Sequence, residues 1–176
     1  AQYNDLESVR NHFEQHPEQI AAIIVEPVAG NMGCIPPQAG FMEGLRKMCN
    51  AHQTLLIFDE VKTGFRLSNG GARETYGVIP DISTYAKSLG NGLPVAAFGG
   101  RSEIMDVIGG GSVTHAGTFG ANGVSMAAAN AVLDILSESP VLNDLSERGT
   151  RLKNGLDQIL TDADLPHQMC GHPNIQ

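Results

Sequence analysis

The sequence predicts an α/β fold, with a mainly parallel sheet flanked by helices. The first observation is an alternating order, in which an apolar run at 20–25 precedes a helical pattern at 40–52 and a second apolar run at 54–59. The second is that the connections are short, which favours right-handed crossovers between parallel strands. The third is that apolar runs stop at Asp59 and at Lys87, as buried strands do at polar carboxyl ends.

The N-terminal elements follow from local patterns. Leu6, Val9 and Phe13 recur at helical spacing behind Asn4 and Asp5, which predicts a capped helix over residues 4–15. The run at 20–25 predicts a buried strand that stops at Glu26-Pro27, because proline cannot continue an inner ladder. Glu26 could bond cofactor-side groups, but a structural ion pair is the favoured role.

Loops follow the first two predicted strands. Residues 30–33 form a turn-rich loop, and Phe41, Leu45 and Met48 then give the helix at 40–52 its period. A long loop is predicted from 63 to 81, and loops of that length commonly border a site. Its Arg66 and Arg73 could hold a carboxylate or phosphate, although solvated or internally paired arginines are the favoured alternative.

The middle of the chain is rich in glycine. A strand is predicted at 82–86 and another at 95–98, with glycines that allow close backbone approach around Lys87 at positions 90, 92, 99 and 100. A short helix is predicted around Ile104, Met105 and Ile108. The three glycines at 109–111 that end it lack the Lys-Ser/Thr of a nucleotide loop, so they predict a hinge.

Two helices are predicted in the last third, over 124–137 and 141–160. The second should place these side chains inward: Leu142, Leu145, Leu152, Leu156 and Ile159. The final segment is predicted as loop. Its three metal-binding residue types lack a fourth ligand, so no metal site is expected from His167, Cys170 and His172. His115 is interpreted as a local structural contact.

Composition limits the class of protein. With 176 residues and 41% hydrophobic residues, the chain is long enough for one domain with a sizeable core. The formal charge of −8, from 19 acids and 11 bases, provides no basic stripe for nucleic acid or anionic lipid. Three irregularly spaced cysteines, no signal peptide and no membrane-length apolar run favour a reducing cytoplasm.

Asp59 and Lys87 together suggest a chemistry. Ligands of open α/β sheets bind beyond the carboxyl ends of the strands, so two such ends can place a carboxylate and an amine in one cleft. An amine that forms a Schiff base and a carboxylate that holds a pyridinium proton suit pyridoxal 5'-phosphate. Solvated strand-terminal residues remain the alternative that spacing alone does not exclude.

The sequence resembles the class III aminotransferases, a pyridoxal-phosphate-dependent family, and among them the glutamate-1-semialdehyde 2,1-aminomutases. The resemblance rests on five collinear motifs: Val25-Glu26-Pro27-Val28-Ala29-Gly30-Asn31-Met32-Gly33, Phe58-Asp59-Glu60-Val61-Lys62-Thr63-Gly64-Phe65-Arg66, Pro80-Asp81-Ile82 leading to Lys87, Gly92-Leu93-Pro94, and His115-Ala116-Gly117-Thr118. Each motif is weak alone, but their joint order is specific.

The resemblance implies roles for particular residues. Lys87 would be the catalytic Schiff-base lysine, Asp59 the partner of the pyridine nitrogen and Val61 a ring-packing residue. Gly117 and Thr118 would contact the phosphate, with Thr118 supplied by the neighbouring subunit of a homodimer. The family commonly opens the following helix with Asn-Pro, whereas this chain has Asn122-Gly123.

The resemblance also implies the function and the extent of the chain. Residues 1–160 would be part of the cofactor-binding large domain, and 161–176 the start of a small domain. The upstream phosphate cradle and ring-stacking aromatic are not found before Asp59, so the chain alone is expected to be inactive. The expected reaction is amino-group transfer on an amino acid or amino ketone, most like the intramolecular transfer of tetrapyrrole precursor synthesis. A class III ω-type aminotransferase and a catalytically silent scaffold remain alternatives.

Overall fold

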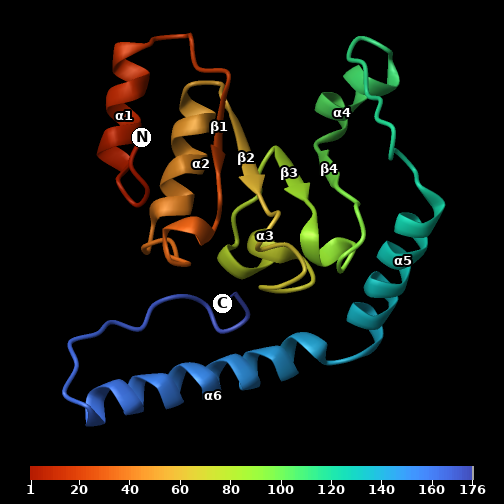
Figure 1. Cartoon of the computed structure of the whole chain (residues 1–176). Coiled ribbons are helices and arrows are strands. Elements are labelled where there is room, and N and C mark those ends of the chain that lie inside the picture. Colours follow the sequence, from red (N-terminus) through yellow and green to blue (C-terminus); the bar gives the residue numbers. More distant parts are fainter. Residues whose placement is uncertain (176) are drawn as a thin grey trace.

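The computed structural model describes residues 1–175 and contains one four-stranded sheet. The strands follow one another in the order β1-β2-β3-β4, with β1, β2 and β3 parallel and β4 antiparallel to β3 (Figure 1). This confirms the predicted α/β class and mainly parallel sheet. The strands are β1 Ala22–Val25, β2 Leu55–Asp59, β3 Ile82–Tyr85 and β4 Ala97–Gly100.

Six α-helices and two 3₁₀ turns connect and extend the described sheet. Asp5 caps the first helix by accepting from Ser8 N at 2.9 Å. Asn122 caps the fifth by accepting from two backbone N–H groups, so the departure at Asn122-Gly123 still opens a capped helix. The elements are α1 Leu6–Gln15, η1 Gly30–Met32, α2 Phe41–Ala51, α3 Gly71–Tyr76, η2 Lys87–Leu89, α4 Ser102–Gly109, α5 Gly123–Glu138 and α6 Val141–Asp162.

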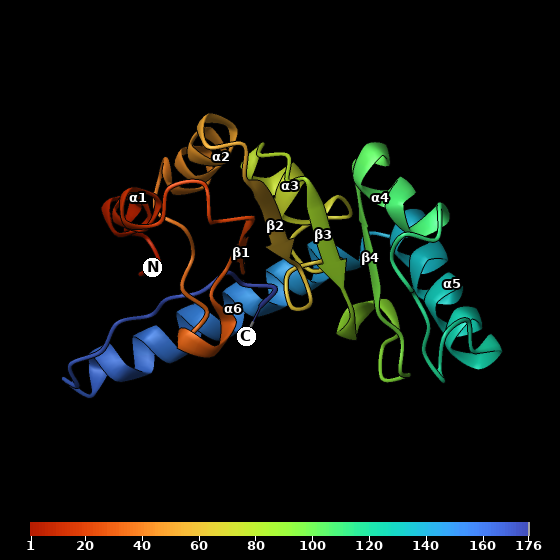
Figure 2. The same ribbon diagram turned by 90° about the horizontal axis from the view of Figure 1, so that it is seen from above.

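The main core lies where α1 and α2 pack beside β1 and β2 (Figures 1 and 2). Leu56 and Phe58 point from β2 into this core and are fully buried. Phe41 and Leu45 meet them from α2, at the helical spacing that the sequence predicts. The core therefore fixes β2, whose carboxyl end carries Asp59.

Three local expectations were wrong. β1 is not buried on both faces, because it is an edge strand and Ile24 is 63% exposed. The predicted loop at 63–81 contains a helix, α3. The last strand is shifted to Ala97–Gly100, because its glycines pair closely with β3; a Cβ on Gly100 would lie 2.2 Å from Asp81 O.

The inward stripe predicted for α6 is also corrected. Leu152 and Leu156 are exposed, and Ile159 is 64% exposed. The reason is that α6 runs past the carboxyl ends of the strands and does not pack on a face of the sheet (Figures 1 and 2). The predicted domain boundary after residue 160 falls in the last turn of this helix and stays a prediction. Within residues 1–175, none of the helices has the length and apolar character needed to cross a membrane.

Candidate active site at the carboxyl ends of the strands

The structure places Asp59 and Lys87 at the same edge of the sheet. Asp59 is the last residue of β2 and pairs in register with Thr84 of β3. Thr84 Oγ1 also donates to Asp59 Oδ1 at 3.4 Å. Lys87 follows at the start of η2, directly after β3 and Ala86. Because these strands are parallel, their carboxyl ends open toward the C-terminal segment and α6 (Figure 1).

One carboxylate oxygen of Asp59 is used to orient the side chain. Val61 N donates to Asp59 Oδ1 at 3.0 Å, in addition to the contact from Thr84. Within the described residues, no hydrogen bond reaches Oδ2. The half-buried carboxylate is therefore held by one oxygen and presents the other as an acceptor.

Lys87 has an exposed side chain on a strained backbone. Its φ is +43°, in the left-handed region that costs an L-residue about 1–2 kcal/mol. The following turn is tightly packed, since a Cβ on Gly90 would lie 2.5 Å from Leu93 O. Backbone strain of this kind is concentrated at functional sites, where the surrounding structure maintains it.

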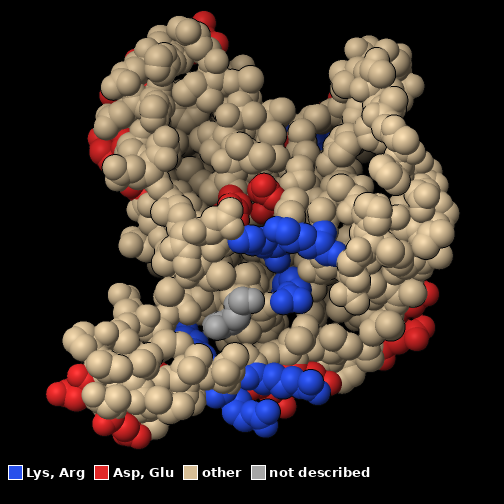
Figure 3. Space-filling model, viewed as in Figure 1, with Lys and Arg blue, Asp and Glu red and all other residues tan. Residues whose placement is uncertain are grey.

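Lys87 lines an open cleft of about 480 Å³ at this edge. Three of the lining residues are cations, Lys62, Arg66 and Lys87, and none is an acid. Figure 3 shows Lys and Arg side chains gathered in the hollow between the sheet and α6. Together these charges favour an anionic ligand. The lining residues are Cys34, Lys62, Arg66, Lys87, Ser88, Asn91, Gly92 and Ile175.

Lys62 was not recognised from the sequence as a site residue. Its Nζ donates to Asn31 Oδ1 at 2.6 Å, and its chain occupies the space beside Gly30. A Cβ on Gly30 would lie 2.6 Å from that Nζ, so a larger residue there would displace the lysine side chain from this position. The sequence pattern alone does not reveal the position of Lys62. Lys62 meets Asn31 only because the fold brings the loop at 30–33 to the end of β2.

The two arginines differ in position. Arg66 lines the cleft, and its Nε donates to Asn174 O at 3.1 Å, while Asn174 Nδ2 donates back to Arg66 O at 2.8 Å. Arg73 lies in α3 and lines a different hollow with Phe65 and Tyr85. Arg66 is thus an anion-binding candidate of this cleft, and Arg73 is not.

Glu26 does not form the expected ion pair within residues 1–175. Its Oε2 instead accepts from Gly30 N at 3.0 Å, which closes the loop after β1. That loop also carries Asn31, the partner of Lys62. Glu26 therefore acts on the cleft indirectly, through the backbone that positions Asn31.

Glu60, next to Asp59, is fully buried and was also missed as a feature of the site. Its Oε2 accepts from Ala72 N at 2.7 Å and from Thr63 Oγ1 at 3.2 Å, whereas Oε1 has no partner. Burial raises the pKa of this carboxyl, and the two donors only partly offset the effect. Glu60 ties α3 to the end of β2, directly behind Asp59.

The predicted phosphate-contacting residues are not among the described residues that line the cleft around Lys87. Gly117 and Thr118 lie exposed in the connection between α4 and α5, where Gly120 N donates to Gly117 O at 2.9 Å. Their contact with a neighbouring subunit's cofactor stays a prediction. His115 makes a local contact, its ring lying edge-on to Phe98 at 5.3 Å.

The polar residues near the C-terminus have separate partners. His167 contacts Asp157 Oδ1 at 3.0 Å, His172 Nδ1 accepts from Asn174 N, and Cys170 Sγ donates to Gly33 O at 3.2 Å. Across the described residues, no group of three or more His, Cys, Asp or Glu side chains is arranged to hold a metal ion.

Comparison with known proteins gives the family. The model of the family described as aminotransferase class-III matches residues 1–174. The chain belongs to the class III aminotransferases. Among curated members, it is 48% identical over 170 residues to a glutamate-1-semialdehyde 2,1-aminomutase of Salinibacter ruber (strain DSM 13855 / M31), covering 95% of this chain and 39% of that protein.

Solved transaminase structures share the fold of this chain. An ω-transaminase from Sphaerobacter thermophilus has a TM-score of 0.89 at 34% identity, over 97% of this chain and 40% of its own. A structure described as a transaminase with PLP bound has a TM-score of 0.89 at 27% identity, over 97% of this chain and 41% of its own. The chain therefore spans about two fifths of the length of these relatives.

Proposed function

We propose that this protein catalyses pyridoxal-phosphate-dependent amino-group transfer on an amino acid or amino ketone. The observation that carries the proposal is the placement of Asp59 and Lys87 at neighbouring parallel strand ends, with Lys87 in a cationic cleft. Membership in the class III aminotransferases supports the same chemistry. The cofactor and its anionic phosphate suit a cleft that Lys62, Arg66 and Lys87 line without an opposing acid.

Each residue has a defined role in this proposal. Bound pyridoxal phosphate supplies an electron sink for the carbon that loses its proton. Lys87 would hold the cofactor through its amine and, when free, its Nζ would move a proton to and from the substrate. Asp59 would hold the ring nitrogen through Oδ2, because Oδ1 is already engaged by Val61 N and Thr84. Val61 would contribute to holding the ring.

The phosphate contacts of Gly117 and Thr118 are proposed to come from a second copy of the chain. Their exposure, far along the chain from Lys87, supports a role across the interface of a homodimer. We place the activity in the cytoplasm, a proposal supported by three free thiols, which a reducing compartment maintains.

The proposed reaction is most like that of a glutamate-1-semialdehyde 2,1-aminomutase, which the 48% identical relative supports. An ω-type aminotransferase with another amine or amino acid is the second candidate, and the 34% identical ω-transaminase structure favours it. A catalytically silent scaffold is the candidate of another class. Assays of intramolecular amino transfer and of transfer to an external keto acid separate these three.

The decisive experiment is borohydride reduction of the natural full-length protein with its cofactor, followed by peptide mapping. The reduced cofactor is expected on Lys87, and Lys87→Ala should abolish both the adduct and turnover. Lys47→Ala, an exposed lysine of α2 outside the cleft, is the matched control and should retain both. An adduct on any other lysine would refute the assignment of Lys87.

A second variant tests Asp59. Asp59→Asn should still bind cofactor and lose most turnover; parent-like turnover would refute the role of Asp59.

A further inference from the structure

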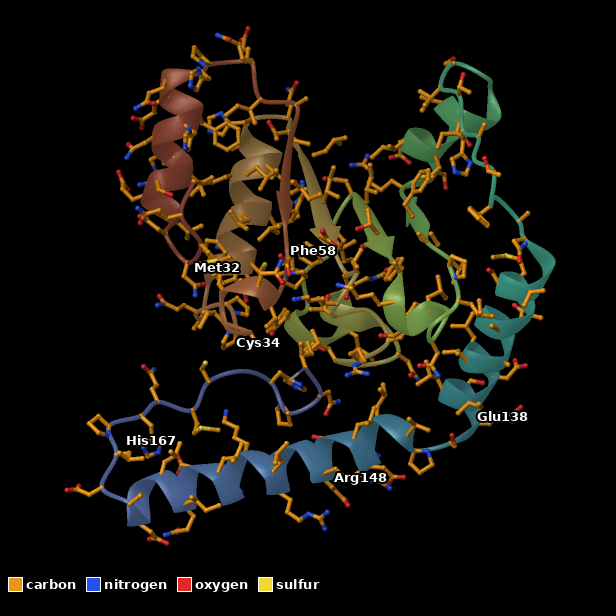
Figure 4. All side chains as sticks on the ribbon, viewed as in Figure 1. Met32, Cys34, Phe58, Glu138, Arg148 and His167 are labelled. Atoms are coloured by element: carbon orange, nitrogen blue, oxygen red, sulfur yellow. The ribbon has the colours of Figure 1, made fainter. Side chains whose placement is uncertain are left out.

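Two cysteines far apart in the sequence lie near each other, and one of them, Cys34, lines the cleft. Cys170 Sγ lies 3.2 Å from Gly33 O, the carbonyl of the peptide bond that leads into Cys34. In turn, a Cβ placed on Gly171 would lie 3.2 Å from the Cβ of Cys34. In Figure 4, Cys34 is labelled on the loop after β1, just above the C-terminal segment in this view.

The approach is maintained by contacts of the residues that follow Cys170. Lys153 Nζ donates to Gly171 O at 3.1 Å, which ties the segment to α6. Arg66 and Asn174 exchange two hydrogen bonds and tie it to the end of β2. The Gly33 carbonyl oxygen lies about 2.8 Å from the next Cα across a standard peptide, so Cys170 Sγ is within roughly 6 Å of Cys34 Cα. A disulfide places its two Cα atoms about 4.4–6.8 Å apart, so the two cysteines lie near enough for a local shift of the C-terminal segment to close the bond.

Cys49, the third cysteine, has a different environment. It lies on the buried face of α2, and its thiol points toward Leu55 O at 3.8 Å. Burial raises the pKa of the Cys49 thiol to about 11, although Arg46 opposes the effect. Buried, protonated thiols are inert. Cys49 is therefore an internal control for reactions at Cys34 and Cys170.

We propose that Cys34 and Cys170 form a thiol pair that a low-molecular-weight disulfide such as glutathione disulfide oxidises to an intramolecular disulfide. The exposed Cys170 thiolate attacks the small disulfide, forms a mixed disulfide and releases one thiol. The Cys34 thiolate then attacks the Cys170 sulfur and expels the second thiol. The two protein thiols lose two electrons and two protons, and the small disulfide becomes two thiols.

The bond would act on the cleft that holds Lys87. Cys34 lines that cleft, and the same loop carries Asn31, which positions Lys62. A covalent link would fasten the C-terminal segment, including Ile175 at the cleft wall, to this loop. In a reducing compartment such a bond is transient and responds to the redox state, in contrast to a permanent structural disulfide.

The test is treatment of the natural full-length protein with glutathione disulfide, with and without pyridoxal phosphate, followed by non-reducing peptide mapping. The expected result is a peptide joining Cys34 to Cys170, with the loss of two of the three free thiols of this chain and their return with dithiothreitol. Cys34→Ser and Cys170→Ser should each lose the link, and Cys49→Ser should retain it. Circular dichroism of each variant confirms that it is folded.

Two results would overturn the proposal. One is folded protein in which Cys170 keeps glutathione and no bond to Cys34 forms. The other is a Cys34 or Cys170 bond only between separate molecules, seen as covalent dimers. Hydrogen exchange gives an independent measure, because the amides of residues 33–34 and 169–171 should exchange more slowly in the oxidised protein than in the reduced one. Equal rates in a mapped, fully linked sample would contradict the proposed fastening of the C-terminal segment.

Discussion

Residues 1–100 and residues 101–175 use apolar side chains in opposite ways. The first region supplies every member of the main buried cluster except Ile175. The second region exposes large apolar side chains on α5, on α6 and on the loop between α4 and α5, among them Phe119, Val124, Ile135, Leu152 and Ile159. The first region has 100 residues and the second has 75, but nearly all of the main buried cluster belongs to the first.

The difference shows what amphipathic patterns determine. Both α2 and α6 carry an apolar stripe at helical spacing, and both segments form helices. The stripe of α2 packs on β2, whereas most of the α6 stripe has no sheet beneath it. An amphipathic pattern therefore predicts that a segment is helical and which of its faces is apolar. Whether that face is buried depends on whether the fold places another element against it. Four predictions test this contrast.

The largest expected effect is a core truncation in the first region. Phe58→Ala removes a fully buried ring from β2 and should lower the free energy of unfolding by about 3–5 kcal/mol. The matched change in the second region, Ile159→Ala, should cost no more than about 0.5 kcal/mol, because that side chain is already exposed. Urea denaturation followed by circular dichroism measures both. Equal losses would mean that α6 is buried in solution; Phe58→Leu serves if the alanine variant does not fold.

The next effect concerns the buried carboxyl beside the site. Gly71 has φ +65°, and an added Cβ would lie 2.4 Å from Glu60 Oε2. Gly77 has nearly the same φ, +67°, with open space around it. Gly77→Ala should therefore cost only the backbone strain, about 1–2 kcal/mol. Gly71→Ala should cost a further 1–3 kcal/mol or so, as the bond from Ala72 N to Glu60 is lost. Similar melting temperatures for the two variants would contradict the described packing of Glu60.

A smaller effect is the pH dependence of stability that the two buried acids produce. Burial acts to raise the pKa of Asp81, but Leu56 N–H, Arg46 and Arg101 outweigh it and lower that pKa. The stabilisation from Asp81 is thus present above its unfolded pKa of about 3.9 and is lost as pH falls through the folded value. The pKa of Glu60 is raised, so its contribution is present below an unfolded value of about 4.3 and is lost as pH rises.

Unfolding free energies of two variants across pH separate these contributions. Asp81→Asn should remove part of the loss of stability at acid pH, and Glu60→Gln should remove part of the loss as pH rises above about 4.3. Glu138→Gln is the control from the second region, because that carboxyl is exposed at the end of α5. Identical pH profiles for Glu60→Gln and the parent would contradict a buried, destabilised carboxylate at position 60.

The smallest effect separates two histidines of the second region. The carbonyl of Leu165 and the carboxylate of Asp157 raise the pKa of His167, whereas burial and the nearby Lys153 lower that of His172. In an NMR titration, His167 should therefore lose its proton at higher pH than His172. The contact between His167 and Asp157 should weaken as pH rises through the folded pKa of His167. His167→Gln assigns the resonance, and the reverse order of titration would contradict the described C-terminal segment.

Local signals predicted much of the fold and part of the site. Asp5 and Asn122 cap their helices through the side-chain oxygens that such residues present to free backbone N–H groups. The apolar run ending at Asp59 became a strand ending at Asp59, and Lys87 follows β3 as expected. α3 was not predicted, because its six residues begin and end among glycines and its position depends on Glu60, eleven residues earlier in the chain.

The sequence by itself determined the order of the strands and of the helices other than α3, the charged residues at the strand ends and the family, because these follow from local periodicity, capping and collinear motifs. Only the tertiary structure decided that Lys62 joins Lys87 and Arg66 in one cleft, that Glu60 is buried behind Asp59, and that Cys170 lies against Gly33, next to Cys34. These arrangements involve segments that are far apart along the chain, and local sequence patterns give no information about such distant contacts. The sheet register and the path of the C-terminal segment bring the segments together. The burial and the electrostatic surroundings of each group follow from that placement.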